Sequence, residues 1–384
     1  MPSATPELRA LAAAVARACG VERPPVVPTG LDWEEVARLA RRHDVAALAH
    51  RGMETPDREL AAAAERAMLR SLHFTVLQGR LLRALHDAGV PALVLKGLAL
   101  AAEAGGDPAV RATRDVDLLV PAGDIGVAVD AVRAAGLEWY GWRRPKDPDR
   151  PPVEPDALAR LDRLPLLRDV KLTDHMGALV ELHWRLFDNS RLMPVDPAWF
   201  AEPHTVVVHG AEVPTLPVAV HLAYVLVHGT NHLWSLMKWL ADVPMLVTRR
   251  PDLADPRMLS RAGAGNDRSL ATGLIVAERV FGPFLPPATR GWARGVGGTT
   301  LLVRRSLGAL AAPEDRAKTV GPRGLPAEAA GRLALRPEPA YKREELRLLL
   351  LGAGRAHAIE DPSTAELVTG PLRWLRRTAR RRVR

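Results

Sequence analysis

Two acidic residues, Asp115 and Asp117, alternate with apolar residues in a segment that reads RDVDLLV over 114–120. Alternation followed by an apolar run predicts a strand, on which residues i and i+2 point to the same face. Two neighbouring carboxylates repel each other unless a cation lies between them. Proteins bind Mg²⁺ through one or two carboxylates, with water and substrate phosphates as the other ligands. The pair therefore predicts a divalent metal site.

A third acid, Glu181, lies on another predicted strand over 178–184, between apolar neighbours that predict burial. Burying a charge without a partner is costly, so Glu181 is interpreted either as a metal ligand or as half of a structural ion pair. His183 follows two residues later and shares the same face of a regular strand. It is interpreted as a base, as a donor beside the metal, or as a core residue.

Basic residues precede the acidic pair. Lys96 and Gly97 directly follow the predicted strand over 91–95. At such a strand–helix turn, the lysine side chain and the backbone N–H groups could bind a phosphate. The alternative for Lys96 is a solvated surface lysine. Arg111 and Arg114 could neutralise the carboxylates or hold a substrate phosphate through their forked guanidinium groups.

Three histidines follow, namely His221, His228 and His232. Their spacing of seven and four residues would place them on one helical face, but Gly229 predicts a break in that helix. We interpret them as contacts to substrate or phosphate, as hydrogen-bonded core histidines, or as zinc ligands.

Lys238 and Asp242 are four residues apart on a predicted helix over 233–248. This spacing can form an ion pair on one helix face. The other interpretation is that Lys238 reaches the triphosphate of a nucleotide.

The surrounding pattern predicts the elements that position these residues. Apolar residues at helical spacing predict a helix that opens over 31–36, and further helices over 57–88, 124–135 and 218–229. Further strands are predicted over 169–172 and 137–142, a loop over 143–165, and a final helix over 342–356. We predict an α+β protein of four parts: a helical region over 1–88, a small mixed-sheet core over 89–215, a helical region over 216–312, and a linker (313–340), final helix and basic tail over 313–384.

Composition and charge limit the partners of the protein. The chain has 384 residues with a formal net charge of +9, but seven arginines lie in the last fourteen residues, which leaves +2 on residues 1–370. A nucleic-acid partner is therefore not expected for the body of the protein. The tail over 371–384 is interpreted as solvated or as a site for an acidic partner.

The single cysteine, Cys19, excludes an internal disulfide and a zinc site made of several cysteines. The first residues lack the basic start of a secretory signal, and no apolar run is long enough to cross a membrane. We expect a cytoplasmic protein.

Taken together, these segments resemble the nucleotidyltransferase superfamily with a polymerase-beta-like fold. That superfamily has a strand, a glycine turn into a helix, Asp-x-Asp on the next strand, and a third carboxylate on a later strand. The resemblance places Gly97 in the glycine turn, Asp115 and Asp117 as the metal-binding pair, and Glu181 as the third carboxylate. The turn reads Lys-Gly here, where the superfamily usually has Gly-Ser.

A bacterial subgroup described only as uncharacterised nucleotidyltransferases is more similar still. Its pattern comprises LKG, then R..R.D.DLLV, then ELHW, then an H......HG..H.....KWL.D segment, all of which this chain contains over roughly 30–250. The resemblance implies a metal-dependent transfer of a nucleoside monophosphate from an NTP, ATP for example, to a hydroxyl on a small molecule, a peptide or a protein.

The resemblance also implies the roles of the residues. Asp115, Asp117 and Glu181 would be catalytic and hold Mg²⁺ or Mn²⁺. The nucleotide would be bound by a larger set, comprising Lys96, Gly97, Arg111, Arg114, His183, His228, His232 and Lys238. Two alternatives stay open: a transferase that uses another phosphate-activated donor such as a nucleotide sugar, and a related binding module without catalysis.

Overall fold

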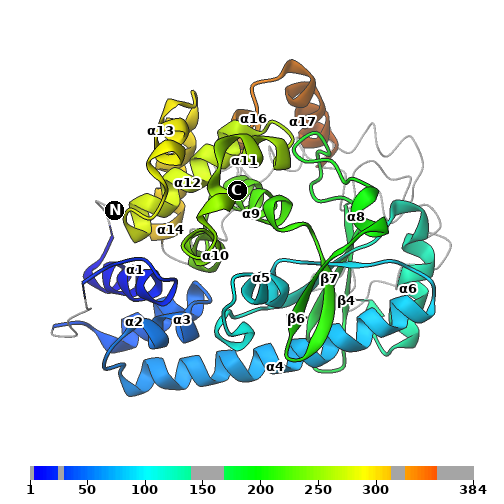
Figure 1. Cartoon of the computed structure of the whole chain (residues 1–384), viewed down its shortest axis with the longest axis horizontal. Coiled ribbons are helices and arrows are strands. Elements are labelled where there is room, and N and C mark those ends of the chain that lie inside the picture. Colours follow the sequence, from blue (N-terminus) through cyan, green and yellow to red (C-terminus); the bar gives the residue numbers. More distant parts are fainter. Residues whose placement is uncertain (1–3, 25–29, 140–167, 313–324, 353–384) are drawn as a thin grey trace, which may run out of the picture. The chain divides into compact units, whose positions relative to one another are not determined.

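A computed structural model of the chain describes four segments, which are residues 4–24, 30–139, 168–312 and 325–352. The loop predicted over 143–165 and the basic tail over 371–384 lie outside the described residues. Figure 1 labels the helices and strands that are used below.

The N-terminal helices begin at residues whose side chains cap them. Thr5 accepts a hydrogen bond of 3.2 Å from the Leu8 N–H, and Asp32 accepts one of 3.1 Å from the Glu35 N–H. These caps precede the first two of the four helices, which are α1 (Pro6–Ala18), α2 (Trp33–Arg42), α3 (Ala46–Gly52) and α4 (Arg58–Asp87). The long helix predicted over 57–88 is thus confirmed and is continuous in Figure 1.

The strands form one mixed sheet in the order β3-β4-β5-β2-β1-β7-β6. Their bounds are β1 (Leu93–Leu95), β2 (Asp115–Leu119), β3 (Glu138–Trp139), β4 (Asp169–Thr173), β5 (Leu179–His183), β6 (His204–Val208) and β7 (Ala211–Thr215). β1 pairs with β7 in parallel, whereas β3 with β4, β4 with β5, and β6 with β7 are antiparallel. The predicted α+β class is confirmed, and β6 and β7 add a hairpin that the sequence pattern did not indicate.

Helices connect and follow these strands. Between the strands lie α5 (Gly97–Glu103), η1 (Pro108–Val110), η2 (Ala122–Asp124), α6 (Ile125–Ala134) and α8 (Ala198–Ala201). After the sheet come α9 (Val218–Asn231), α10 (Met237–Val247), η3 (Pro251–Ala254), α11 (Pro256–Ala262), α12 (Asp267–Phe281), α13 (Pro287–Gly295), α14 (Thr299–Ala311), α16 (Leu325–Ala334) and α17 (Pro339–Gly352). None of the helices in the described residues is long and apolar enough to span a membrane.

The described residues fall into two compact units that interleave along the chain. The first unit contains the described residues 4–24, 30–80, 93–117 and 198–312, and the second contains 81–92, 118–139, 168–197 and 325–352. In the first unit α1 packs on α3, and α12 packs on α9, α13 and α14. In the second unit β4 pairs with β5, and α16 packs on α17. One of the boundaries between the units along the chain lies within β2, between Asp117 and Leu118. The four parts predicted from the sequence stay a prediction.

Two expectations about helix ends were wrong. Gly229 does not break its helix, because α9 continues to Asn231. The glycine instead makes room for a neighbour: a Cβ at this position would lie 2.3 Å from the Trp234 ring. The linker predicted over 313–340 contains helix α16 from Leu325 to Ala334.

Candidate functional site

The turn between β1 and α5 has an unusual backbone conformation. β1 is a run of three buried apolar residues, and the chain then reverses at Lys96, which has φ 55° and ψ −151°. Gly97 follows with φ 56°. Glycine adopts a positive φ readily, but a residue with a Cβ pays about 1–3 kcal/mol in this region. The turn therefore holds Lys96 in a backbone conformation that costs energy.

The side chain of Lys96 lies on the second acid of β2. Its Nζ is 3.2 Å from Oδ2 of Asp117, and both side chains are largely buried. The same Nζ lies 5.7 Å from the centre of the Tyr224 ring, a distance at which a cation is attracted to an aromatic face. Lys96 is buried, so the alternative prediction of a solvated surface lysine was wrong.

Strand β2 presents Asp115 and Asp117 two residues apart, as the alternation predicted. Asp115 is half-buried and Asp117 is buried. The Thr113 hydroxyl donates to the Asp115 carbonyl oxygen at 2.9 Å, which fixes the start of the strand. A small pocket opens over the turn and this strand, and Lys96, Gly97, Thr113, Asp115 and Asp117 are among its lining residues.

Strand β5 carries Glu181 and His183, which are both buried and share one face as predicted. Glu181 Oε2 lies 3.3 Å from His183 Nε2, and Asp169 Oδ2 lies 3.8 Å from His183 Nδ1. The antiparallel register places Lys171 of β4 directly opposite Glu181, and the two form an ion pair. Burial disfavours the charge on Lys171, but the Glu181 carboxylate outweighs burial and raises the pKa of this lysine.

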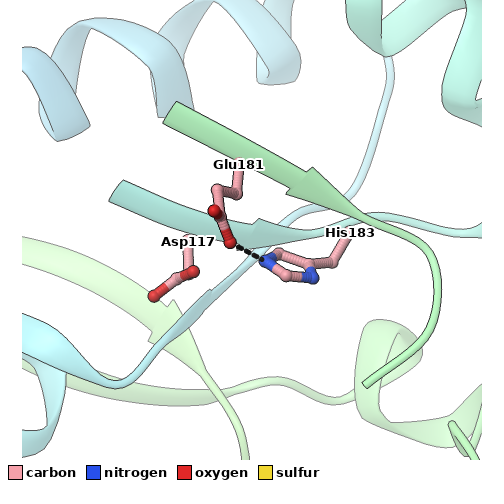
Figure 2. Close-up of side chains that lie close together, drawn as sticks. All are labelled: Asp117, Glu181 and His183. Atoms are coloured by element: carbon pink, nitrogen blue, oxygen red, sulfur yellow. Dashed lines mark ion pairs between the residues drawn. The ribbon is translucent and has the colours of Figure 1, made fainter. Parts of the chain in front are cut away.

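Among the described residues, Asp117, Glu181 and His183 form a group that could hold a metal ion, and we refer to it as the metal-binding group. Each offers one ligand atom, and these atoms lie within 4.8 Å of one another. Figure 2 shows the Asp117 carboxylate from β2 and the Glu181 and His183 side chains from the neighbouring strand β5 turned toward one another. Two carboxylates and an imidazole are suitable ligands for a divalent cation. The residues present therefore fit a metal ion, with His183 in the group and Asp115 outside it.

Arg111 is paired elsewhere. Its Nε and one terminal nitrogen lie 3.0 and 2.7 Å from the two carboxylate oxygens of Asp242 on α10. The side chains are only 4% and 1% exposed. Burial lowers the pKa of Arg111, but the charge and hydrogen bonds of Asp242 outweigh burial and raise it. The i, i+4 pair expected between Lys238 and Asp242 is replaced by this longer-range pair.

Arg114 and Lys238 share a carboxylate that the sequence analysis did not single out. Asp44 Oδ2 lies 2.6 Å from Arg114 Nε and 3.1 Å from Lys238 Nζ. Asp44 has φ 55°, and its side chain is almost completely buried. Lys238 is buried with it, whereas the Arg114 side chain is 52% exposed. Of these two cations, Arg114 is the one that solvent reaches.

The three histidines divide between two environments. His228 and His232 lie near each other with tilted rings, whose centres are 4.6 Å apart. The two rings lie 5.2 and 5.4 Å from the Trp239 ring. His221 is fully buried, and its Nε2 lies 2.9 Å from the Lys96 backbone nitrogen. His221 therefore contacts the β1–α5 turn directly, through the backbone.

The structure thus brings together part of the predicted site. Lys96, Gly97, Asp115 and Asp117 line one pocket, and Glu181 and His183 join Asp117 in the metal-binding group. Arg111, Arg114 and Lys238 form ion pairs with Asp242 and Asp44 instead. Whether any of these residues binds nucleotide stays a prediction.

Sequence reasoning missed Lys171, Asp169 and Asp44. Lys171 lies on a predicted strand and is one of only six lysines among 53 basic residues, which was a usable signal. Its pairing with Glu181 depends on the register of the β4–β5 hairpin, which the sequence does not determine. Asp44 lies in a short HD segment between two helices and carried no signal of its own.

Comparison with known proteins gives one result. The model of a family described as "Uncharacterised nucleotidyltransferase" matches residues 29–282, about two thirds of the chain. No curated protein matches the sequence. The matched region contains β1, β2 and β5, and therefore the whole metal-binding group.

Proposed function

Because the chain belongs to the family described as uncharacterised nucleotidyltransferases, we propose that it is a metal-dependent enzyme that transfers a nucleoside monophosphate from an NTP to an acceptor hydroxyl. The acceptor is a small molecule, a peptide or a protein. The observation that carries this proposal is the buried group of Asp117, Glu181 and His183 on two neighbouring strands.

Asp117 and Glu181 would hold Mg²⁺ or Mn²⁺, which prefer carboxylate oxygens. His183, 3.3 Å from Glu181, would orient that carboxylate or serve as a further ligand. When bound, the metal would stabilise negative charge on the triphosphate. Asp115 lies two residues before Asp117 on β2 and lines the same pocket, where it would contribute a third carboxylate.

In the proposed reaction the acceptor oxygen attacks the α-phosphorus of the NTP. A new phosphorus–oxygen bond forms, the bond to the β-phosphate oxygen breaks, and pyrophosphate leaves with that electron pair. The hydroxyl proton needs an acceptor, and Glu181 is the candidate general base.

Lys96 and the backbone at Gly97 would bind the triphosphate. Lys96 Nζ is already beside Asp117, so it would stabilise the phosphates next to the metal. Arg114 is the second candidate, because half of its side chain is exposed. Arg111 is held on both carboxylate oxygens of Asp242, and we assign it a structural role.

A thermal-shift experiment tests the proposal. NTPs and nucleotide sugars are added with and without Mg²⁺ to the wild-type chain and to Asp117→Asn, with Asp130→Asn on the exposed face of α6 as the matched control. We expect NTPs with Mg²⁺ to raise the melting temperature of the wild type and of the control, but not of Asp117→Asn.

The other outcomes distinguish the alternatives. Stabilisation by nucleotide sugars but not by NTPs would replace the donor class and keep the metal site. NTP stabilisation that needs neither Mg²⁺ nor Asp117 would contradict the enzyme and favour a binding module. Incubation with radiolabelled NTP and a lysate then tests transfer to an acceptor.

A further inference from the structure

The buried His221 is linked to the β1–α5 turn by a chain of hydrogen bonds. The Lys96 N–H donates to His221 Nε2 at 2.9 Å. Because Nε2 accepts, the proton of the neutral ring lies on Nδ1, which is 3.5 Å from the Thr215 hydroxyl oxygen. That hydroxyl donates to the Val94 carbonyl oxygen at 2.6 Å.

These contacts join three elements around one residue. Val94 lies on β1, two residues before Lys96, and Thr215 is its partner in the parallel register of β7. His221 comes from α9, whose later residue Tyr224 faces the Lys96 ammonium. The strained lysine is therefore held by its backbone on one side and by its side chain on the other.

The charge state of His221 suits this role. Burial, together with the positive charges of Arg111, His204 and Lys96, lowers its pKa to about 3. The ring is neutral at ordinary pH, so Nε2 keeps the lone pair that accepts the Lys96 N–H.

We propose that His221 is a positioning residue of the nucleotide site: by accepting the Lys96 N–H it holds the turn in the conformation that places the Lys96 ammonium beside Asp117 and the triphosphate. This inference rests on the proposed function. His221 does not need to touch the nucleotide, since it acts through the backbone of Lys96.

A second buried histidine provides a matched control. His43 is equally buried, and its Nδ1 accepts the backbone N–H of Met237 at 3.4 Å. Replacing it removes the same kind of hydrogen bond from the start of α10, at Met237 instead of Lys96.

The experiment uses the full chain and three variants, His221→Leu, His221→Gln and His43→Leu. The glutamine carries an oxygen at the distance of Nε2 and can still accept the N–H, whereas leucine cannot. Hydrogen exchange is measured on peptides that span 93–100, and Mg²⁺–ATP affinity is measured by calorimetry. If His221→Leu does not fold, Thr215→Val removes the hydroxyl below the ring and replaces it in the comparison.

We expect His221→Leu to exchange faster at the turn and to bind Mg²⁺–ATP about tenfold more weakly, as the loss of one buried hydrogen bond implies. His221→Gln restores both properties, and His43→Leu changes neither. Wild-type affinity in a folded His221→Leu, or an equal loss in His43→Leu, overturns the positioning role. A wild-type chain that binds no NTP with Mg²⁺ contradicts the proposed function itself, which is a different result.

Discussion

Two regions of the first unit pair basic side chains with buried carboxylates, and each contains a buried histidine that accepts a backbone N–H. The turn cluster consists of Lys96, Gly97, Asp117 and His221. The helix lock consists of His43, Asp44, Arg111, Arg114, Lys238 and Asp242. Both contain residues whose types predicted phosphate binding.

The two regions differ in what the pairing accomplishes. In the helix lock, Arg111 and Asp242 satisfy each other at two points and are almost completely buried. In the turn cluster the backbone of Lys96 is strained, and its partner Asp117 belongs to the metal-binding group. Residue type and spacing therefore do not show which cations pair within the helix lock and which one lies beside the metal-binding group, whereas their partners in the fold do.

The largest expected effect is on activity in the turn cluster. Asp117→Asn removes a negative charge from the metal-binding group, and transfer is expected to fall about a thousandfold or more because metal stabilisation of the phosphates is lost. The circular dichroism spectrum stays that of the wild type. The measurement is the rate of label transfer from NTP, and full activity in this variant would contradict the metal-binding group.

In the helix lock the expected effect is on stability. Arg111→Met leaves Asp242 buried without its partner, which costs about 3–5 kcal/mol of unfolding free energy. Urea denaturation measures this loss, and the double variant Arg111→Met with Asp242→Leu is expected to recover much of it. If Arg111→Met is as stable as the wild type but does not bind nucleotide, the structural role assigned to Arg111 is contradicted, and the helix lock takes part in nucleotide binding.

The pH dependence of the free energy of unfolding tests the buried histidine of each region. Burial, followed by nearby positive charges, lowers the pKa of both His43 and His221 to about 3, against about 6.5 in the unfolded chain. Below pH 6.5 the unfolded chain therefore binds one more proton for each histidine. The two histidines therefore make their full contribution to the free energy of unfolding above pH 6.5. As the pH falls from 6.5 toward 3, this contribution decreases by about 1.4 kcal/mol per pH unit for each histidine.

Urea denaturation at pH 5, 6 and 7 measures this slope. His43→Gln and His221→Gln each remove one titrating group, so each variant is expected to flatten the pH dependence by the same amount. A slope that neither substitution changes would show that these rings are not buried in the neutral form.

A smaller effect isolates the backbone strain of the turn cluster. Lys96→Ala and Lys96→Gly both remove the ion pair with Asp117, but only glycine adopts φ 55° without cost. The glycine variant is expected to be about 1 kcal/mol more stable than the alanine variant. Thermal unfolding of the two variants gives the difference, and an alanine variant of equal or greater stability would mean that the turn is not strained.

The sequence pattern predicted the elements near the site well. Strands expected over 91–95, 114–120 and 178–184 occur as β1, β2 and β5, because short apolar or alternating runs leave few other structures. Burial of Glu181 and the shared face of His183 follow from the same alternation.

What could not be predicted depends on distant partners. Arg111 and Asp242 are 131 residues apart, and His221 meets Lys96 across 125 residues. The alternation also does not distinguish Asp115 from His183 as a member of the metal-binding group, because membership depends on how β2 and β5 are aligned. Gly229 looked like a helix break because its packing against Trp234 is a tertiary contact.

The most direct test of the metal-dependent nucleotide site is a crystal structure of the chain with Mn²⁺ and a non-hydrolysable NTP, with the metal located by anomalous scattering. We expect a manganese peak bound by the carboxylates of Asp117 and Glu181, with the triphosphate on the Lys96–Gly97 turn. A manganese ion and nucleotide bound away from β2 and β5, or a nucleotide bound with Lys96 and Lys171 still paired to Asp117 and Glu181 and no metal between them, would contradict it.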